Sequence, residues 1–69
     1  MTGEELKNIA INFWGERGYV NALALALGVD RTQVWRYIRG NTIPGPVRAA
    51  VIAWRRRFAE TGETPEPLS

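Results

Sequence analysis

The sequence contains no cysteine and no histidine. Disulfide bridges are therefore excluded, as is a zinc site made of thiolate and imidazole ligands. The longest apolar run, Ala22 to Leu27, is far shorter than the roughly 18 residues of a membrane span. We expect no membrane segment, no metal and no small-molecule cofactor. Because cysteine is absent and Glu4 and Glu5 stand where a signal peptide has basic residues, we expect a cytoplasmic protein.

The chain has 69 residues, which is enough for one domain with a thin core. Without disulfides or metals, such a chain depends on well-packed helices or on oligomerisation for its stability.

The formal net charge of +2 hides a strong asymmetry. Residues 17–57 carry eight arginines and one acid, a net charge of +7, whereas the two ends together carry −5. A positive middle between acidic ends indicates either an oriented docking face for a polyanion such as nucleic acid or an ordinary solvated surface.

Apolar spacing and capping residues predict an all-α domain of four to five helices over residues 1–59, followed by a disordered acidic, proline-rich tail over residues 60–69. The first predicted helix covers residues 2–17, with Thr2 and Glu5 forming a capping box and Gly18 favoured over Gly15 at its end. The second covers residues 20–27, where "ALALAL" also alternates like a strand, but alanine favours a helix.

The third predicted helix covers residues 31–39, with Asp30 and Gln33 as a second capping box and Gly40-Asn41 as its stop. The fourth opens at Pro46 and ends at about Phe58. Its apolar stripe consists of Val47, Ala50, Val51, Trp54 and Phe58.

The third helix has two chemically different sides. At about 3.6 residues per turn, Val34, Tyr37 and Ile38 point inward. The other side then carries Arg31, Thr32, Trp35, Arg36 and Arg39. A helix of this width fits the major groove of DNA, where arginine pairs with guanine or neutralises a phosphate.

The segment "VNALALALGVDRTQVWRYIR", residues 20–39, resembles the helix-turn-helix unit of small phage Cro-type and repressor-type proteins. The matching features are the small residue at the helix crossing, the glycine of the turn, the apolar residues around it and the "GN" step after the unit: Ala24, Gly28, Leu23, Leu27, Val29, Val34, Tyr37, Ile38, Gly40 and Asn41. The chain departs from the family at Val20, where a glutamine is common, and at Trp35, where a small or polar residue is common.

We predict a homodimer that binds duplex DNA at a palindromic operator and represses transcription. The resemblance implies a phage or mobile-element setting and autoregulation of its own operon. Small regulators encoded beside anti-CRISPR genes belong to this class. The resemblance implies base contacts by Arg31, Thr32, Gln33, Trp35 and Arg36. It implies phosphate contacts by Asn21, Arg39, Asn41 and Thr42, and Arg48 lies where it could join them.

A dimer brings two recognition helices about 34 Å apart, one turn of DNA. We predict that it uses the fourth helix, through Ala49, Ile52, Ala53, Trp54 and Phe58. The alternative is that Ile52 only widens the core stripe. Arg55 to Arg57 either contact phosphate or form a solvated helix end.

Two other functions stay open. Trp35 could anchor a protein partner, making the chain an adaptor on a helix-turn-helix scaffold, or the protein could bend DNA as an excision-control factor. The sequence has no arrangement of residues typical of catalysis and no Gly-rich phosphate loop, so we expect that it is not an enzyme.

Overall fold

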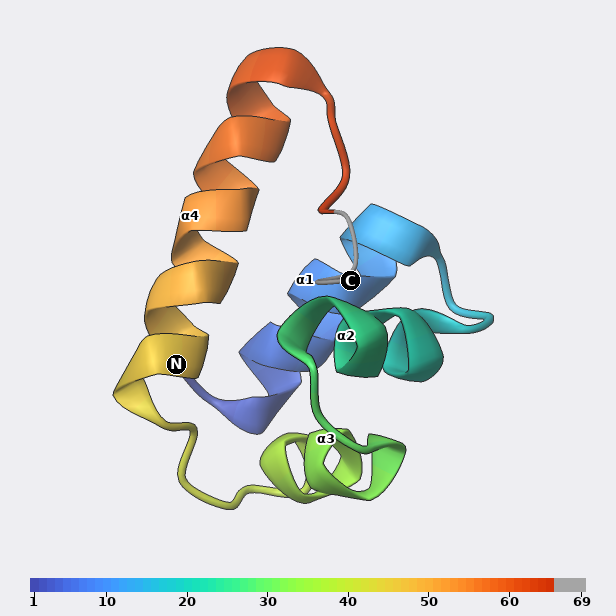
Figure 1. Cartoon of the computed structure of the whole chain (residues 1–69), viewed down its shortest axis with the longest axis vertical. Coiled ribbons are helices and arrows are strands. Elements are labelled where there is room, and N and C mark those ends of the chain that lie inside the picture. Colours follow the sequence, from blue (N-terminus) through green and yellow to red (C-terminus); the bar gives the residue numbers. More distant parts are fainter. Residues whose placement is uncertain (66–69) are drawn as a thin grey trace.

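The computed structural model describes residues 1–65, which form four helices and no strand: α1 (Gly3–Trp14), α2 (Tyr19–Leu27), α3 (Arg31–Ile38) and α4 (Gly45–Thr61). The all-α prediction is confirmed. Helices α1, α2 and α3 pack against one another, and α4 stands beside them (Figure 1).

The start of α1 is fixed by local hydrogen bonds. The backbone N–H of Glu5 donates to the Thr2 hydroxyl at 3.1 Å, and that hydroxyl donates to the Glu5 carboxylate at 3.4 Å. The helix ends at Trp14, three residues before the predicted end. Gly15 is its C-cap, and Gly18, predicted at that position, is instead the N-cap of α2.

Gly28 makes the turn between α2 and α3. Its φ of 72° lies in the left-handed region, which side chains other than glycine rarely adopt. The N–H groups of Gly28 and Val29 donate to Leu25 and Ala24 at 3.3 and 3.0 Å, which is the hydrogen-bond pattern of a Schellman motif. The turn therefore stops α2 and directs the chain into α3.

Asp30 occupies the N-cap of α3 as predicted, but its side chain makes no capping hydrogen bond. The backbone N–H of Gln33, which an aspartate cap would bind, donates to the Asp30 carbonyl at 3.0 Å instead. The predicted capping box is therefore wrong at this helix.

All four helices contribute to one core. Its fully buried centre consists of one large side chain from each helix: Leu6, Leu23, Val34 and Val51. Around it lie Ala10, Tyr19, Ala24 and Tyr37, also buried. No polar or charged side chain among residues 1–65 is buried, so the core is held together by apolar packing.

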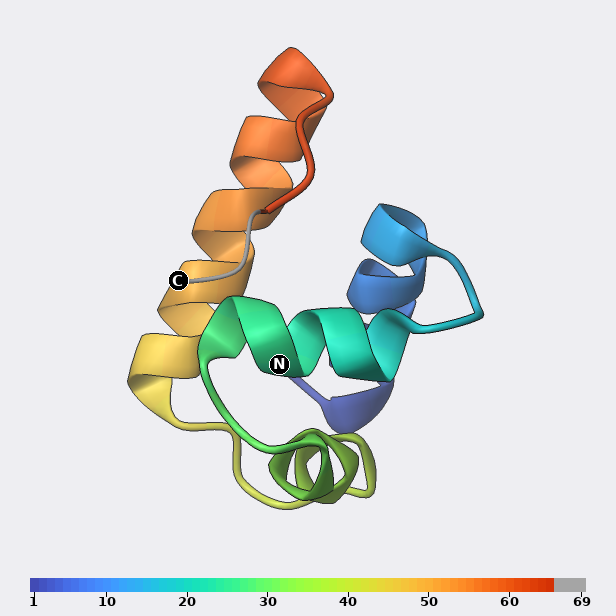
Figure 2. The same ribbon diagram turned by 45° about the vertical axis from the view of Figure 1, so that its right-hand side comes forward.

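Helix α4 is attached less extensively than the others. Val51 is its one buried residue, and its C-terminal half projects beyond the other helices at the end of the molecule opposite α3 (Figures 1 and 2). The helix continues through Glu60 and Thr61, past the predicted end at Phe58, which corrects the boundary of the predicted tail. The last four residues of the chain, 66–69, lie outside the described residues.

None of the helices in residues 1–65 is both long enough and apolar enough to cross a membrane. The same residues contain no cluster of three or more carboxylates that could hold a metal ion.

Candidate nucleic-acid interface

The two sides of α3 are separated as the sequence predicts. Val34 and Tyr37 are buried against α1 and α2, while Ile38 is half-buried. The opposite side is solvent-exposed and carries Arg31, Thr32, Trp35, Arg36 and Arg39. Helix α3 lies at one end of the molecule (Figure 2), and its exposed side is cationic.

Trp35 lines two concavities on this face. One is lined by Trp35 together with Thr32, Arg36 and Arg39. The other extends towards the start of α2 and includes Trp35, Arg31 and Asn21. The structure therefore brings six of the predicted DNA-contacting residues into one continuous surface, which we call the α3 face: Asn21, Arg31, Thr32, Trp35, Arg36 and Arg39.

Gln33 differs from the other predicted base-contacting residues. It is half-buried, at the border between the inner and outer sides of α3, and lines neither concavity. Its amide is thus less accessible to a groove than the side chains of the α3 face.

The remaining predicted phosphate contacts follow α3. The Asn41 N–H donates to the Arg36 carbonyl at 3.0 Å, and the Gly40 N–H donates to Tyr37 at 3.2 Å, so that the chain turns sharply at the end of the helix. Asn41, Thr42 and Arg48 are exposed on this loop and on the first turn of α4. They line neither of the two concavities.

The charge of the α3 face is largely uncompensated. Within residues 1–65 the one ion pair closer than 4.0 Å joins Arg57 to Glu63, at the far end of α4. The guanidinium groups of Arg31, Arg36 and Arg39 have no carboxylate of residues 1–65 within that distance, so within this part of the chain their charge is not neutralised by an ion pair. Glu16, however, lines the concavity of Asn21 and Arg31, a neighbour that the sequence pattern did not indicate.

The five predicted dimer residues divide between two sides of α4. Ala49, Ile52 and Ala53 are exposed and share one outward face, with Ile52 44% exposed. Trp54 and Phe58 are half-buried on the side that faces the domain. The Phe58 ring packs edge-on against Phe13 of α1, with their ring centres 5.3 Å apart.

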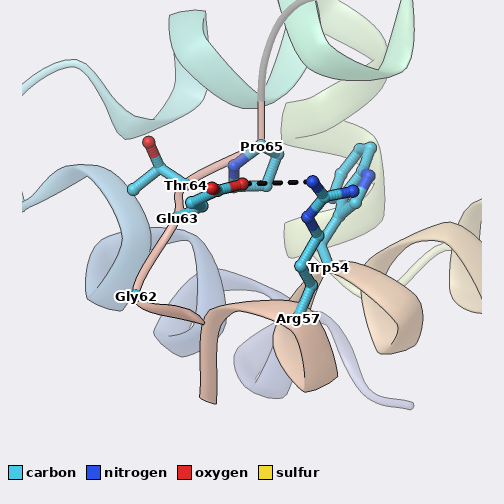
Figure 3. Close-up of a pocket in the computed structure, with 6 residues that line it drawn as sticks. All are labelled: Trp54, Arg57, Gly62, Glu63, Thr64 and Pro65. Atoms are coloured by element: carbon cyan, nitrogen blue, oxygen red, sulfur yellow. Dashed lines mark hydrogen bonds and ion pairs between the residues drawn. The ribbon is translucent and has the colours of Figure 1, made fainter. Parts of the chain in front are cut away.

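Trp54 also lines a third concavity, between α4 and the segment that follows it. The segment 62–65 folds back beside the end of α4, and Arg57 and Glu63 form an exposed ion pair of 3.1 Å there (Figure 3). Because this concavity lies on the projecting half of α4, it is separate from the α3 face.

The chain matches no known family, no curated protein and no solved structure. The resemblance to phage helix-turn-helix regulators thus depends on the residues of the central block alone.

Proposed function

We propose that this protein binds duplex DNA sequence-specifically by inserting α3 into the major groove. The observation that carries the proposal is the α3 face, where three arginines, a threonine and a tryptophan share the exposed side of one helix. The major groove admits one α-helix and presents base-specific hydrogen-bonding groups that arginine and threonine recognise.

In this proposal the residues divide into two roles. Arg31, Thr32, Trp35 and Arg36 contact base edges, with Gln33 at the margin of that set. Asn21, Arg39, Asn41, Thr42 and Arg48 contact phosphates on either side of the groove. Phosphate contacts supply salt-dependent affinity, and base contacts supply sequence preference.

The protein acts as a two-fold dimer in this proposal, because two recognition helices one DNA turn apart select a palindromic site. The exposed face of Ala49, Ile52 and Ala53 supports a dimer through α4, whereas Trp54 and Phe58 are engaged within the monomer. A dimer bound across a promoter represses it. The autoregulatory, phage-borne setting follows from the family resemblance.

The decisive experiment selects bound sequences from random duplex DNA. We expect enrichment of a palindrome with half-sites about 10 base pairs apart, and binding that weakens steeply as salt rises. Arg36→Ala should abolish enrichment at one position of each half-site. Arg55→Ala is the matched control, since Arg55 is an exposed arginine on the projecting half of α4. If no sequence is enriched, the proposal is wrong.

A second candidate function is favoured by one observation, the 44% exposure of Trp35. Exposed tryptophans often anchor protein interfaces. An interface anchored by an aromatic side chain depends little on salt, whereas DNA binding loses affinity steeply between 50 and 200 mM salt. The salt dependence of partner binding therefore distinguishes the two functions: steep for DNA and weak for a protein partner anchored by Trp35.

A further inference from the structure

Trp35 is unusual among the exposed apolar side chains of this protein. The large hydrophobic residues most exposed in residues 1–65 are Leu25, Trp35 and Ile52. Of these, Trp35 alone lies on α3 and lines both concavities of the α3 face. The exposed indole is therefore placed among groups that suit DNA.

The indole is not used for packing between aromatic rings. In the described part of the chain, the aromatic ring pairs join Phe13 to Trp14 and Phe13 to Phe58. Both pairs lie at the C-terminal end of α1, and neither includes Trp35. On α3 itself, the residues that share these concavities with Trp35 are polar or cationic: Arg31, Thr32, Arg36 and Arg39. Towards α2, the concavity of Arg31 is also lined by Glu16, Tyr19 and Val20. An exposed indole with arginines around it suits a partner surface that has one apolar group with hydrogen-bonding or anionic groups around it.

The floor of the major groove has one apolar group, the C5-methyl of thymine. Base edges of guanine, cytosine and adenine offer hydrogen-bond donors and acceptors there, and phosphates border the groove. A methyl group buried against an aromatic ring loses contact with water, which favours binding. Guanidinium groups beside the indole suit the neighbouring guanine edges and phosphates.

We infer that Trp35 reads a thymine methyl group, so that each half-site contains a T·A pair where uracil in place of thymine weakens binding. The inference depends on the proposed function and names the base that this site requires. It also explains why an aromatic side chain is tolerated on the exposed side of a short recognition helix.

The test uses the full chain and the DNA sequence obtained by selection. The thymines of one half-site are replaced by deoxyuridine one at a time, in separate duplexes. Each replacement removes the methyl group and leaves base pairing unchanged. We expect binding about fourfold weaker at one position, the effect of one methyl group left out of an apolar contact. The other thymines should give ratios near one.

The variant Trp35→Ala assigns the effect to its residue. In this variant the deoxyuridine and thymine duplexes should bind equally, whatever the overall loss of affinity. Thr32→Ser is the control: it removes the one methyl group among the side chains of the α3 face, keeps the hydroxyl and should preserve the fourfold ratio. Thermal unfolding followed by circular dichroism establishes that both variants are folded.

The outcomes separate this inference from the proposed function. If the protein binds its selected DNA but no deoxyuridine substitution weakens binding, methyl reading is wrong and DNA binding stands. The same holds if the fourfold ratio persists in Trp35→Ala. If no DNA sequence is selected at all, both the inference and the proposed function are wrong.

Discussion

Gly3 in the first turn of α1 lies directly against the carbonyl oxygen of Ile38 at the end of α3. A Cβ atom at Gly3 would overlap this oxygen and that of Tyr37. The two backbones approach this closely because Gly3 has no side chain. The contact joins the start of the domain to the end of the helix that carries the α3 face.

Gly3→Ala should therefore destabilise the protein. The added methyl group meets backbone atoms, so the helices must separate, and overpacking of this kind costs about 1–3 kcal/mol. For a domain of this size, each 1 kcal/mol lowers the midpoint of thermal unfolding by about 4–8 °C. Gly45→Ala is the matched control, because nothing lies within 4 Å of a Cβ atom there. Equal midpoints for the two variants would contradict the close approach.

Glu16 should oppose DNA binding. Glu16 lines the same concavity as Asn21, the residue to which we assign a phosphate contact. Two unit charges about 10 Å apart in water repel by about 0.4 kcal/mol, so Glu16→Gln should tighten binding about twofold at low salt. The gain should vanish at high salt, where charges are screened. Glu60→Gln, on the projecting half of α4, should leave affinity unchanged; a gain there as well would mean that only net charge matters.

Arg36 and Arg39 should affect DNA binding in different ways. Arg36→Ala should cost about 1–3 kcal/mol on the selected sequence and relax the preference at one base pair. Arg39→Ala should weaken binding to all sequences alike and reduce the slope of log affinity against log salt by about 1. Titrations of selected and scrambled duplexes at four salt concentrations measure both effects. If the two variants gave the same affinities for both duplexes at every salt concentration, the assignment of Arg36 to a base and Arg39 to a phosphate would be wrong.

Val51 and Ile52 are adjacent in sequence, but truncation of Val51 should lower stability, whereas truncation of Ile52 should weaken the dimer. Val51 is 1% exposed in the core, so Val51→Ala should lower the free energy of unfolding by about 2 kcal/mol. Ile52 lies on the outward face of α4, so Ile52→Ala should change monomer stability by less than about 0.5 kcal/mol. The same substitution should shift the dimer towards monomer in sedimentation velocity. A dimer unaffected by Ile52→Ala would exclude this face of α4.

The ion pair of Arg57 and Glu63 should contribute little to stability. The two side chains are 71% and 63% exposed, and solvent-exposed pairs are worth about 0–1 kcal/mol. Glu63→Gln should therefore shift the free energy of unfolding by at most about 1 kcal/mol at 0.15 M salt. Chemical denaturation of the two proteins side by side measures this difference, and a loss above about 2 kcal/mol would show that segment 62–65 supports the fold.

Much of the α3 face follows from the sequence because helical periodicity is local. Once residues 31–38 form a helix, about 3.6 residues per turn place Val34 and Tyr37 opposite Thr32 and Arg39. The helix needs only one apolar side to pack, so the position of the outer side is set as well. Capping and turn residues, which also act locally, predicted the Thr2 cap, the Gly28 turn and the stop at Gly40.

Tertiary packing decided what local patterns leave open. The sequence placed Trp54 and Phe58 both on the apolar stripe of the fourth helix and among the predicted dimer residues. The docking of α4 puts Phe58 against Phe13 and so engages it within the monomer. Glycine is needed at position 3 because the end of α3, distant in sequence, lies against it. Glu16 and Arg31 line one concavity only because the fold brings their segments together. Local spacing thus determined the helices and their apolar sides. The relative placement of those helices depends on shape and close contact between segments, which only the folded chain specifies.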